Sequence, residues 1–118
     1  MRRIEQAELR ETAVVPLVLE ARGLDVTPEM AARLERAGDA ESAAILYRIY
    51  RDEIGHVAVG LRWFDRLCRA RGLIPEAVFH DRVRRSFGGD LKPLFNREAR
   101  AAAGFPAHYY EPLAAGMR

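Results

Sequence analysis

The sequence predicts an all-α protein, in which a long helical hairpin is followed by shorter helices. Apolar residues recur at steps of three and four along most of the chain, which is the period of one helix face. Glycine, proline, aspartate and asparagine stand where these stretches begin and end. No stretch alternates apolar and polar residues well enough to predict a strand.

The composition is that of one small globular domain. Of the 118 residues, 49% are hydrophobic and 31% are charged, and the net charge of +2 is too small to indicate nucleic-acid binding. The basic run DRVRRSF is read as a solvated helix face, which would meet phosphate only if the substrate were RNA. With the single Cys68, no apolar run of membrane-spanning length and no leader after Met1, we expect a cytoplasmic protein.

The first part of the chain predicts two helices, separated at Gly23. A glycine-free stretch over about residues 3–22 contains Pro16, which removes one backbone donor and is expected to bend the helix. Gly23 is typical of a helix C-cap. A short second helix is then predicted, with Thr27 as its N-cap and Pro28 at its first position.

The longest helix is predicted from about Ala40 to Arg71, with Asp39 as its N-cap and Gly72 after its end. At about 1.5 Å per residue it would be close to 50 Å long. One apolar stripe is expected to be buried along it. Its positions are Ile45, Ile49, Glu53, His56, Gly60, Phe64 and Leu67.

Shorter helices are predicted in the last third of the chain. Pro75 begins one of them, the loop GGDLKP follows, and Asn96 caps another. The chain is divided into a helical domain over residues 1–103 and a tail over residues 104–118. Two prolines in this tail predict an extended or flexible segment.

A carboxylate and an imidazole lie together on the predicted buried stripe. Glu53 and His56 are three residues apart and project from one helix face, where they can reach one metal ion together. Di-iron carboxylate bundles use this spacing, and they take a further glutamate from another helix for each such pair. Glu20, near the end of the first predicted helix, fits that role. The plainer alternative is a pair that is solvated or hydrogen-bonded locally.

Neighbouring residues extend the candidate metal site. Asp52 gives the motif Asp-Glu-x-x-His, in which an aspartate can hydrogen-bond the outer nitrogen of a metal-bound histidine on a different helix. Gly60 lies one turn beyond His56 and indicates either close helix packing or space for a ligand. Tyr50 and Trp63 are candidate pocket residues, for which packing is the plainer interpretation.

Three motifs, EARGLDVTP, DEIGHV and FNREARAAAGF, stand within a pattern that covers about residues 14–110. This pattern resembles the C-terminal half of DUF455, an uncharacterised bacterial family that is similar to ferritin-like non-haem iron proteins. The resemblance implies half of a ferritin-like four-helix bundle, with Glu20, Glu53 and His56 as metal ligands. In that family the first half brings another Glu and another Glu-x-x-His, which this chain lacks.

The resemblance implies a di-metal carboxylate protein that activates oxygen to oxidise or hydroxylate a substrate. Carboxylate and imidazole ligands suit iron, with manganese as the alternative. Without a nucleotide-binding glycine loop, electrons are expected from a separate reductase. The missing half leaves three interpretations: a homodimer, a separate partner chain that supplies the N-terminal half, or a metal-free relic that serves as a helical interaction module.

Overall fold

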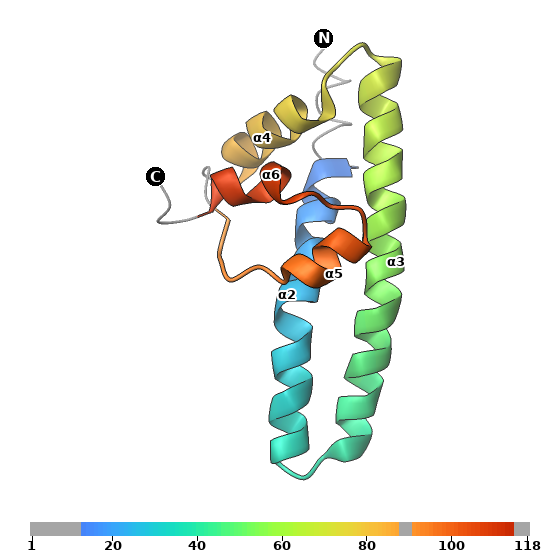
Figure 1. Ribbon diagram of the computed structural model, residues 1–118, viewed down its shortest axis with the longest axis vertical. Coiled ribbons are helices and arrows are strands. Elements are labelled where there is room, and N and C mark those ends of the chain that lie inside the picture. The colour runs from blue at the N-terminus through green and yellow to red at the C-terminus, as the bar shows by residue number, and fades with distance from the viewer. Residues whose placement is uncertain (1–12, 88–90, 115–118) are drawn as a thin grey trace.

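A hairpin of two long helices forms the frame of the molecule. The computed structural model describes residues 13–87 and 91–114. The hairpin consists of α2 (Val15–Arg36) and α3 (Ala40–Ala70), whose axes run side by side (Figure 1). The predicted all-α fold is confirmed, because the described residues contain no strand and only one isolated bridge, between Leu91 and Ala114.

Short helices follow the hairpin and cover one side of it. They are α4 (Pro75–Ser86), α5 (Arg97–Ala102), α6 (Ala107–Tyr110) and the 3-10 helix η2 (Glu111–Leu113). In Figure 1, α4 and α6 lie near the end of the hairpin opposite its turn, and α5 lies near its middle. Among the described residues, no helix is both long enough and apolar enough to cross a membrane.

The predicted ends of α3 are confirmed. Gly38 turns the chain with a φ of +87°, a conformation that glycine adopts without steric cost. The Asp39 side chain then accepts a hydrogen bond from the Ser42 backbone N–H at 3.0 Å and caps α3. Gly72 follows the helix with a φ of +69°.

The predicted helix break at Gly23 is wrong, because α2 continues through Gly23, Thr27 and Pro28. Pro28 has no N–H to donate to the carbonyl of Leu24, four residues earlier. Asn96 replaces that bond, since its Nδ2 donates to the Leu24 carbonyl at 3.0 Å. A distant segment therefore satisfies the group that proline leaves unpaired. The predicted start of the first helix, at about residue 3, lies outside the described residues.

The hydrophobic core lies between the hairpin and the short helices. Phe64 of α3, Phe79 of α4 and Phe105 before α6 are each at most 1% exposed. Phe79 meets Phe64 and Phe105 edge to face, with ring centroids 6.3 and 5.5 Å apart. Such edge-to-face pairs add stability beyond the apolar area that they bury.

The prediction of an extended or flexible tail is wrong for residues 104–114. This segment forms α6 and η2, and it buries Tyr110, Leu113 and Ala114. The two prolines fit the fold because one precedes α6 and the other lies in the first turn of η2. Residues 115–118 lie outside the described part of the chain.

A buried ion pair fastens α5 to the middle of α2. Arg100 donates to both carboxylate oxygens of Asp25, at 2.9 and 2.6 Å, and the two side chains are 4% and 1% exposed. The backbone N–H of Asn96 donates to the same carboxylate at 2.8 Å. The rings of Phe95 and Tyr110 lie 4.8 and 4.3 Å from the guanidinium carbon. Bidentate pairing with a carboxylate and cation–π contact with aromatic rings together favour arginine at this position.

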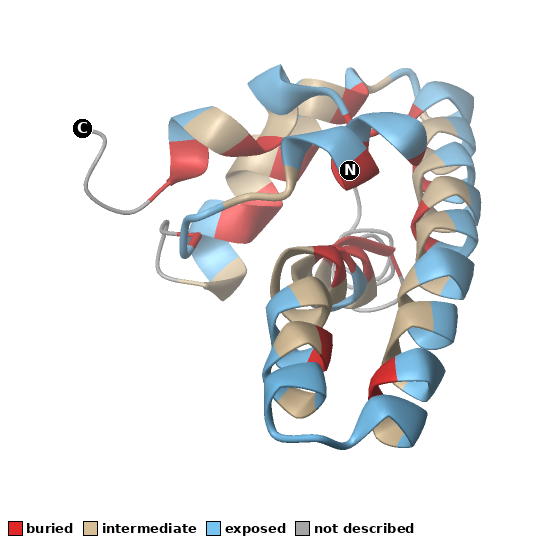
Figure 2. Ribbon diagram, turned by 60° about the horizontal axis from the view of Figure 1, so that its bottom comes forward, coloured by how far each residue is buried: buried red, intermediate tan, exposed pale blue. Residues whose placement is uncertain are grey.

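The predicted buried stripe of α3 is only partly buried. Phe64 is buried as expected, but Ile45 and Ile49 are 53% and 50% exposed. The positions that face inward instead include Val57 and Cys68, which are fully buried. Figure 2 shows α3 with its buried positions turned inward and its outer side exposed.

Removing either member of the buried ion pair should destabilise the fold strongly. For Asp25→Ala we expect a loss of about 3–5 kcal/mol in the free energy of unfolding, because the Arg100 charge stays buried without its partner. Arg100→Ala should cost less, because Arg22 still lies 3.5 Å from the Asp25 carboxylate. Arg85→Ala is the control, since it breaks an exposed pair with Asp81. Urea unfolding measures all three variants, and a loss at Asp25 no larger than that of the control would contradict the assignment.

Cys68 should make stability fall with pH in the alkaline range. Burial, and next the Asp65 carboxylate, raise the pKa of the Cys68 thiol to about 11. The unfolded chain ionises this thiol at a pKa of about 8.5, so between these values it binds fewer protons than the folded chain, and folding weakens as pH rises. The stability difference between wild type and Cys68→Ala should shrink between pH 8 and pH 10.5. An unchanged difference would show that the thiol is not protected.

Candidate metal centre

Glu53 and His56 lie next to each other on α3. The Oε2 atom of Glu53 is 3.3 Å from Nδ1 of His56. Two atoms that bind one metal ion at about 2.0–2.2 Å would lie roughly 3 Å apart. The observed separation therefore suits shared coordination of an ion by this pair.

Glu53 carries a buried oxygen with no hydrogen-bond partner. Its side chain is 20% exposed, and its Oε1 atom is buried and unpartnered among the described residues. The side chain lies over Gly23 of α2, where an added Cβ would be 3.8 Å from Cγ of Glu53. A buried carboxylate oxygen without a partner is costly, so this atom is suited to accept a cation. His56 is more open, with a side chain that is 64% exposed.

Glu20 and His56 line one groove of about 350 Å³ between α2 and α3. The other lining residues are Ala13, Pro16, Leu17, Val59, Gly60 and Trp63. The structure thus brings two of the three predicted ligands to one groove and places the third, Glu53, beside His56. Within residues 13–87 and 91–114, however, no group of three His, Cys, Asp or Glu side chains is close enough to hold a metal ion.

This groove opens on the side of the hairpin that the short helices leave uncovered. All of its lining belongs to Ala13, α2 and α3, whereas Asn96, the N-cap of α5, is bonded to Leu24, Asp25 and Tyr50. Tyr50 and His56 are six residues apart, which separates them by about 120° around the helix axis. We call the uncovered side the open face. It carries Pro16, Glu20, Ile45, Ile49, Glu53, His56, Val59, Gly60 and Trp63.

The other predicted site residues have different surroundings. Gly60 lies at a close approach of the helices, since an added Cβ would be 3.6 Å from Leu17, and it also lines the groove. Trp63 is 54% exposed, so it lies in the groove wall and not in the core. Tyr50 lies away from the groove, with its hydroxyl accepting from Asn96 at 2.9 Å. Asp52 is exposed, and the described residues give it no hydrogen bond or ion pair.

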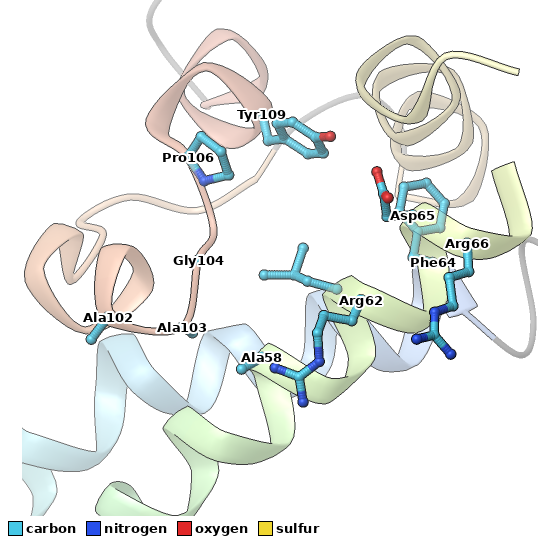
Figure 3. Close-up of a pocket in the computed structure, with 11 residues that line it drawn as sticks. Ala58, Arg62, Phe64, Asp65, Arg66, Ala102, Ala103, Gly104, Pro106 and Tyr109 are labelled. Atoms are coloured by element: carbon cyan, nitrogen blue, oxygen red, sulfur yellow. The ribbon is translucent and has the colours of Figure 1, made fainter. Parts of the chain in front are cut away.

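A second cavity, of about 520 Å³, lies between α3 and the segment that joins α5 to α6 (Figure 3). The Asp65 carboxylate on its wall already accepts from Arg69 at 2.8 Å. In the close-up, the guanidinium groups of Arg62 and Arg66 point away from Tyr109 on the opposite wall. This arrangement does not gather metal donors, so the groove on the open face is the better candidate site.

Comparison with known proteins shows the family. The family described as "Protein of unknown function (DUF455)" matches residues 1–111, and the chain belongs to it. The chain is also 41% identical, over 96 residues, to an uncharacterized protein of Haemophilus influenzae. The matched region is 81% of this chain and 33% of that protein, so the chain spans about a third of the length of this curated relative. No solved structure matches.

Replacing Glu53 by an apolar residue should stabilise the metal-free protein. Glu53→Met removes the buried oxygen that has no partner and keeps the length of the side chain, so we expect a gain of about 1–2 kcal/mol in the free energy of unfolding. Glu20→Met is the matched control, because it removes an exposed carboxylate from the neighbouring helix. Urea unfolding in the presence of a chelator measures both. A loss of stability at Glu53→Met would indicate that Oε1 has a partner in solution.

Proposed function

We propose that this chain supplies half of a di-metal carboxylate centre in an oxygen-activating oxidoreductase. The ligands from this chain are Glu20, Glu53 and His56, and the metal is iron, with manganese as the alternative. One observation carries the proposal. Glu53 has a buried oxygen, Oε1, without a partner, and its other oxygen, Oε2, lies 3.3 Å from Nδ1 of His56, which lines a groove together with Glu20.

The donor set supports iron or manganese more than other metals. The two carboxylates are hard oxygen donors, the imidazole is a borderline nitrogen donor, and the site includes no soft thiolate, because Cys68 is buried elsewhere in the core. Glu53 and His56 come from adjacent turns of one rigid helix, so their relative position is fixed by α3. Glu20 comes from α2, whose position against α3 is fixed by the hairpin.

An iron pair in this centre would supply the activation of dioxygen and the oxidation or hydroxylation of a substrate. The chain's own residues hold the donors and shape their surroundings. Pro16, Leu17, Val59 and Trp63 form an apolar wall next to Glu20 and His56. Once a partner covers the groove, such a wall would exclude water from the donors and offer an apolar substrate a surface to bind. A separate reductase would supply the electrons for this reaction.

A metal-free helical interaction module is the second candidate. The observation that favours it is the exposure of Ile45, Ile49 and Trp63 on the open face, where a partner helix could bury them. Under this alternative, Glu53 and His56 are only a locally bonded pair on the helix surface.

Metal content per chain separates the two candidates. We would express the protein with iron and manganese supplied, separate it by size, and determine both metals by elemental analysis. The proposal expects about one metal ion per chain in the assembled species. At a metal concentration of about 100 times the dissociation constant, binding should add about 2.7 kcal/mol to the free energy of unfolding. A folded wild type without metal would favour the interaction module.

The double variant Glu53→Ala, His56→Ala tests whether these residues are the ligands. It should lose both the bound metal and the metal-dependent stabilisation. Asp65→Ala, Arg69→Ala is the matched control, because it removes a bonded pair of opposite charges from the same helix, away from the open face. Equal metal content in the two double variants would rule out Glu53 and His56 as ligands.

A further inference from the structure

We infer that two copies of this chain associate through their open faces, and that a divalent cation between the copies is required for the association. The inference rests on the proposed function, since it uses the same Glu20, Glu53 and His56. The occupant of the open face is a second copy of this chain, and a bound divalent cation is the condition under which that copy binds.

The spacing of residues on α3 fits a second helical surface. Ala43, Tyr50, Val57 and Phe64 follow one another at steps of seven and pack inside the chain. A separate series on the open face, Ile49, His56 and Trp63, also has steps of seven, and its members are 50%, 64% and 54% exposed. A repeat of seven keeps one seam of a helix against a neighbouring helix over several turns. The exposed seam therefore lacks a helical partner within the described residues.

The open face is large enough for a specific dimer. It extends over the 22 residues of α2 and the facing part of the 31 residues of α3. Two helices about 33 Å long and about 10 Å wide offer about 650 Å². Two such faces would bury about 1,300 Å² in total, which lies at the low end of the range of about 1,200–2,000 Å² for specific interfaces. A twofold dimer uses the same patch on both copies, so one apolar seam is enough to build the contact.

The charges on the open face oppose a dimer that has no cation. The residues that define this face include Glu20 and Glu53 but no lysine or arginine. Two such faces would bring four carboxylates together, and like charges at an interface repel. A divalent cation bound by both copies would remove this repulsion and give Oε1 of Glu53 its missing partner. Metal binding and dimerisation would then be thermodynamically linked.

The mass of the full chain in solution tests this inference directly. We would measure it by light scattering coupled to size exclusion, with a chelator and with Mn²⁺ as the probe. We expect the 13.3 kDa monomer with the chelator and twice that mass with Mn²⁺. Ile49→Arg should remain a monomer in both conditions. Ile74→Arg is the matched control, because it replaces another exposed isoleucine, at the start of α4, and should behave like wild type.

A second variant tests the role of the carboxylates. In Glu20→Gln, Glu53→Gln the mass should no longer respond to Mn²⁺, whichever state the variant adopts. A metal response in this variant, a wild-type mass that is equal in both conditions, or a dimer that survives Ile49→Arg would each overturn the inference.

The same measurements separate this inference from the proposed function. A monomer that binds Mn²⁺ through Glu53 and His56 would overturn the dimer and leave the metal centre standing. A monomer without bound metal would overturn both. A dimer that forms in the chelator would overturn the metal requirement, and metal content would then decide the function.

Discussion

The ion pair between Asp25 and Arg100 is the interaction on which the rest of the arrangement depends. It lies at the middle of α2, is almost fully buried, and draws α5 onto the hairpin. Asn96, four residues before Arg100, bonds both Asp25 and the Leu24 carbonyl that Pro28 leaves free. One polar cluster therefore keeps α2 continuous and fixes the short helices to one side of the hairpin. The opposite side remains uncovered, and it is there that Glu20, Glu53 and His56 lie.

The sequence predicts helix ends correctly where the residues that make them are close together in the chain. Asp39 and Asn96 each cap a helix with their own side chain, as predicted, because a cap needs only the next three residues. The prediction of a helix break at Gly23 was wrong, because Asn96, far along the sequence, donates the hydrogen bond to the Leu24 carbonyl that Pro28 cannot donate. The prediction of an extended tail was wrong for a similar reason, since Phe105 packs on the ring of Phe79, Tyr110 packs on the ring of Phe95, and both lie against Arg100. Long-range contacts override local propensity in both cases.

In the candidate site too, the features with local causes are predictable from the sequence, and those that depend on helix packing are not. The closeness of Glu53 and His56 follows from helix geometry alone, and the structure shows it. The position of Glu20 depends on how α2 packs against α3, which no local pattern specifies. Periodicity also does not tell which of the two apolar faces of α3 is buried in the chain. The prediction that Ile45 and Ile49 lie on the buried face is therefore wrong. The motifs EARGLDVTP and FNREARAAAGF contain Asp25 and Arg100, but only the fold shows that these residues pair.

The most direct measurement is anomalous X-ray scattering from crystals of the full chain grown with Mn²⁺. We expect an anomalous peak on the open face, within coordination distance of Glu53 and His56, with Glu20 on the same ion or on a neighbouring one. Such a peak would place the metal beside the buried, unpartnered oxygen of Glu53, which is suited to accept a cation. Ordered crystals with no peak there, or with Mn²⁺ bound only at other residues, would rule out a metal centre at Glu53 and His56.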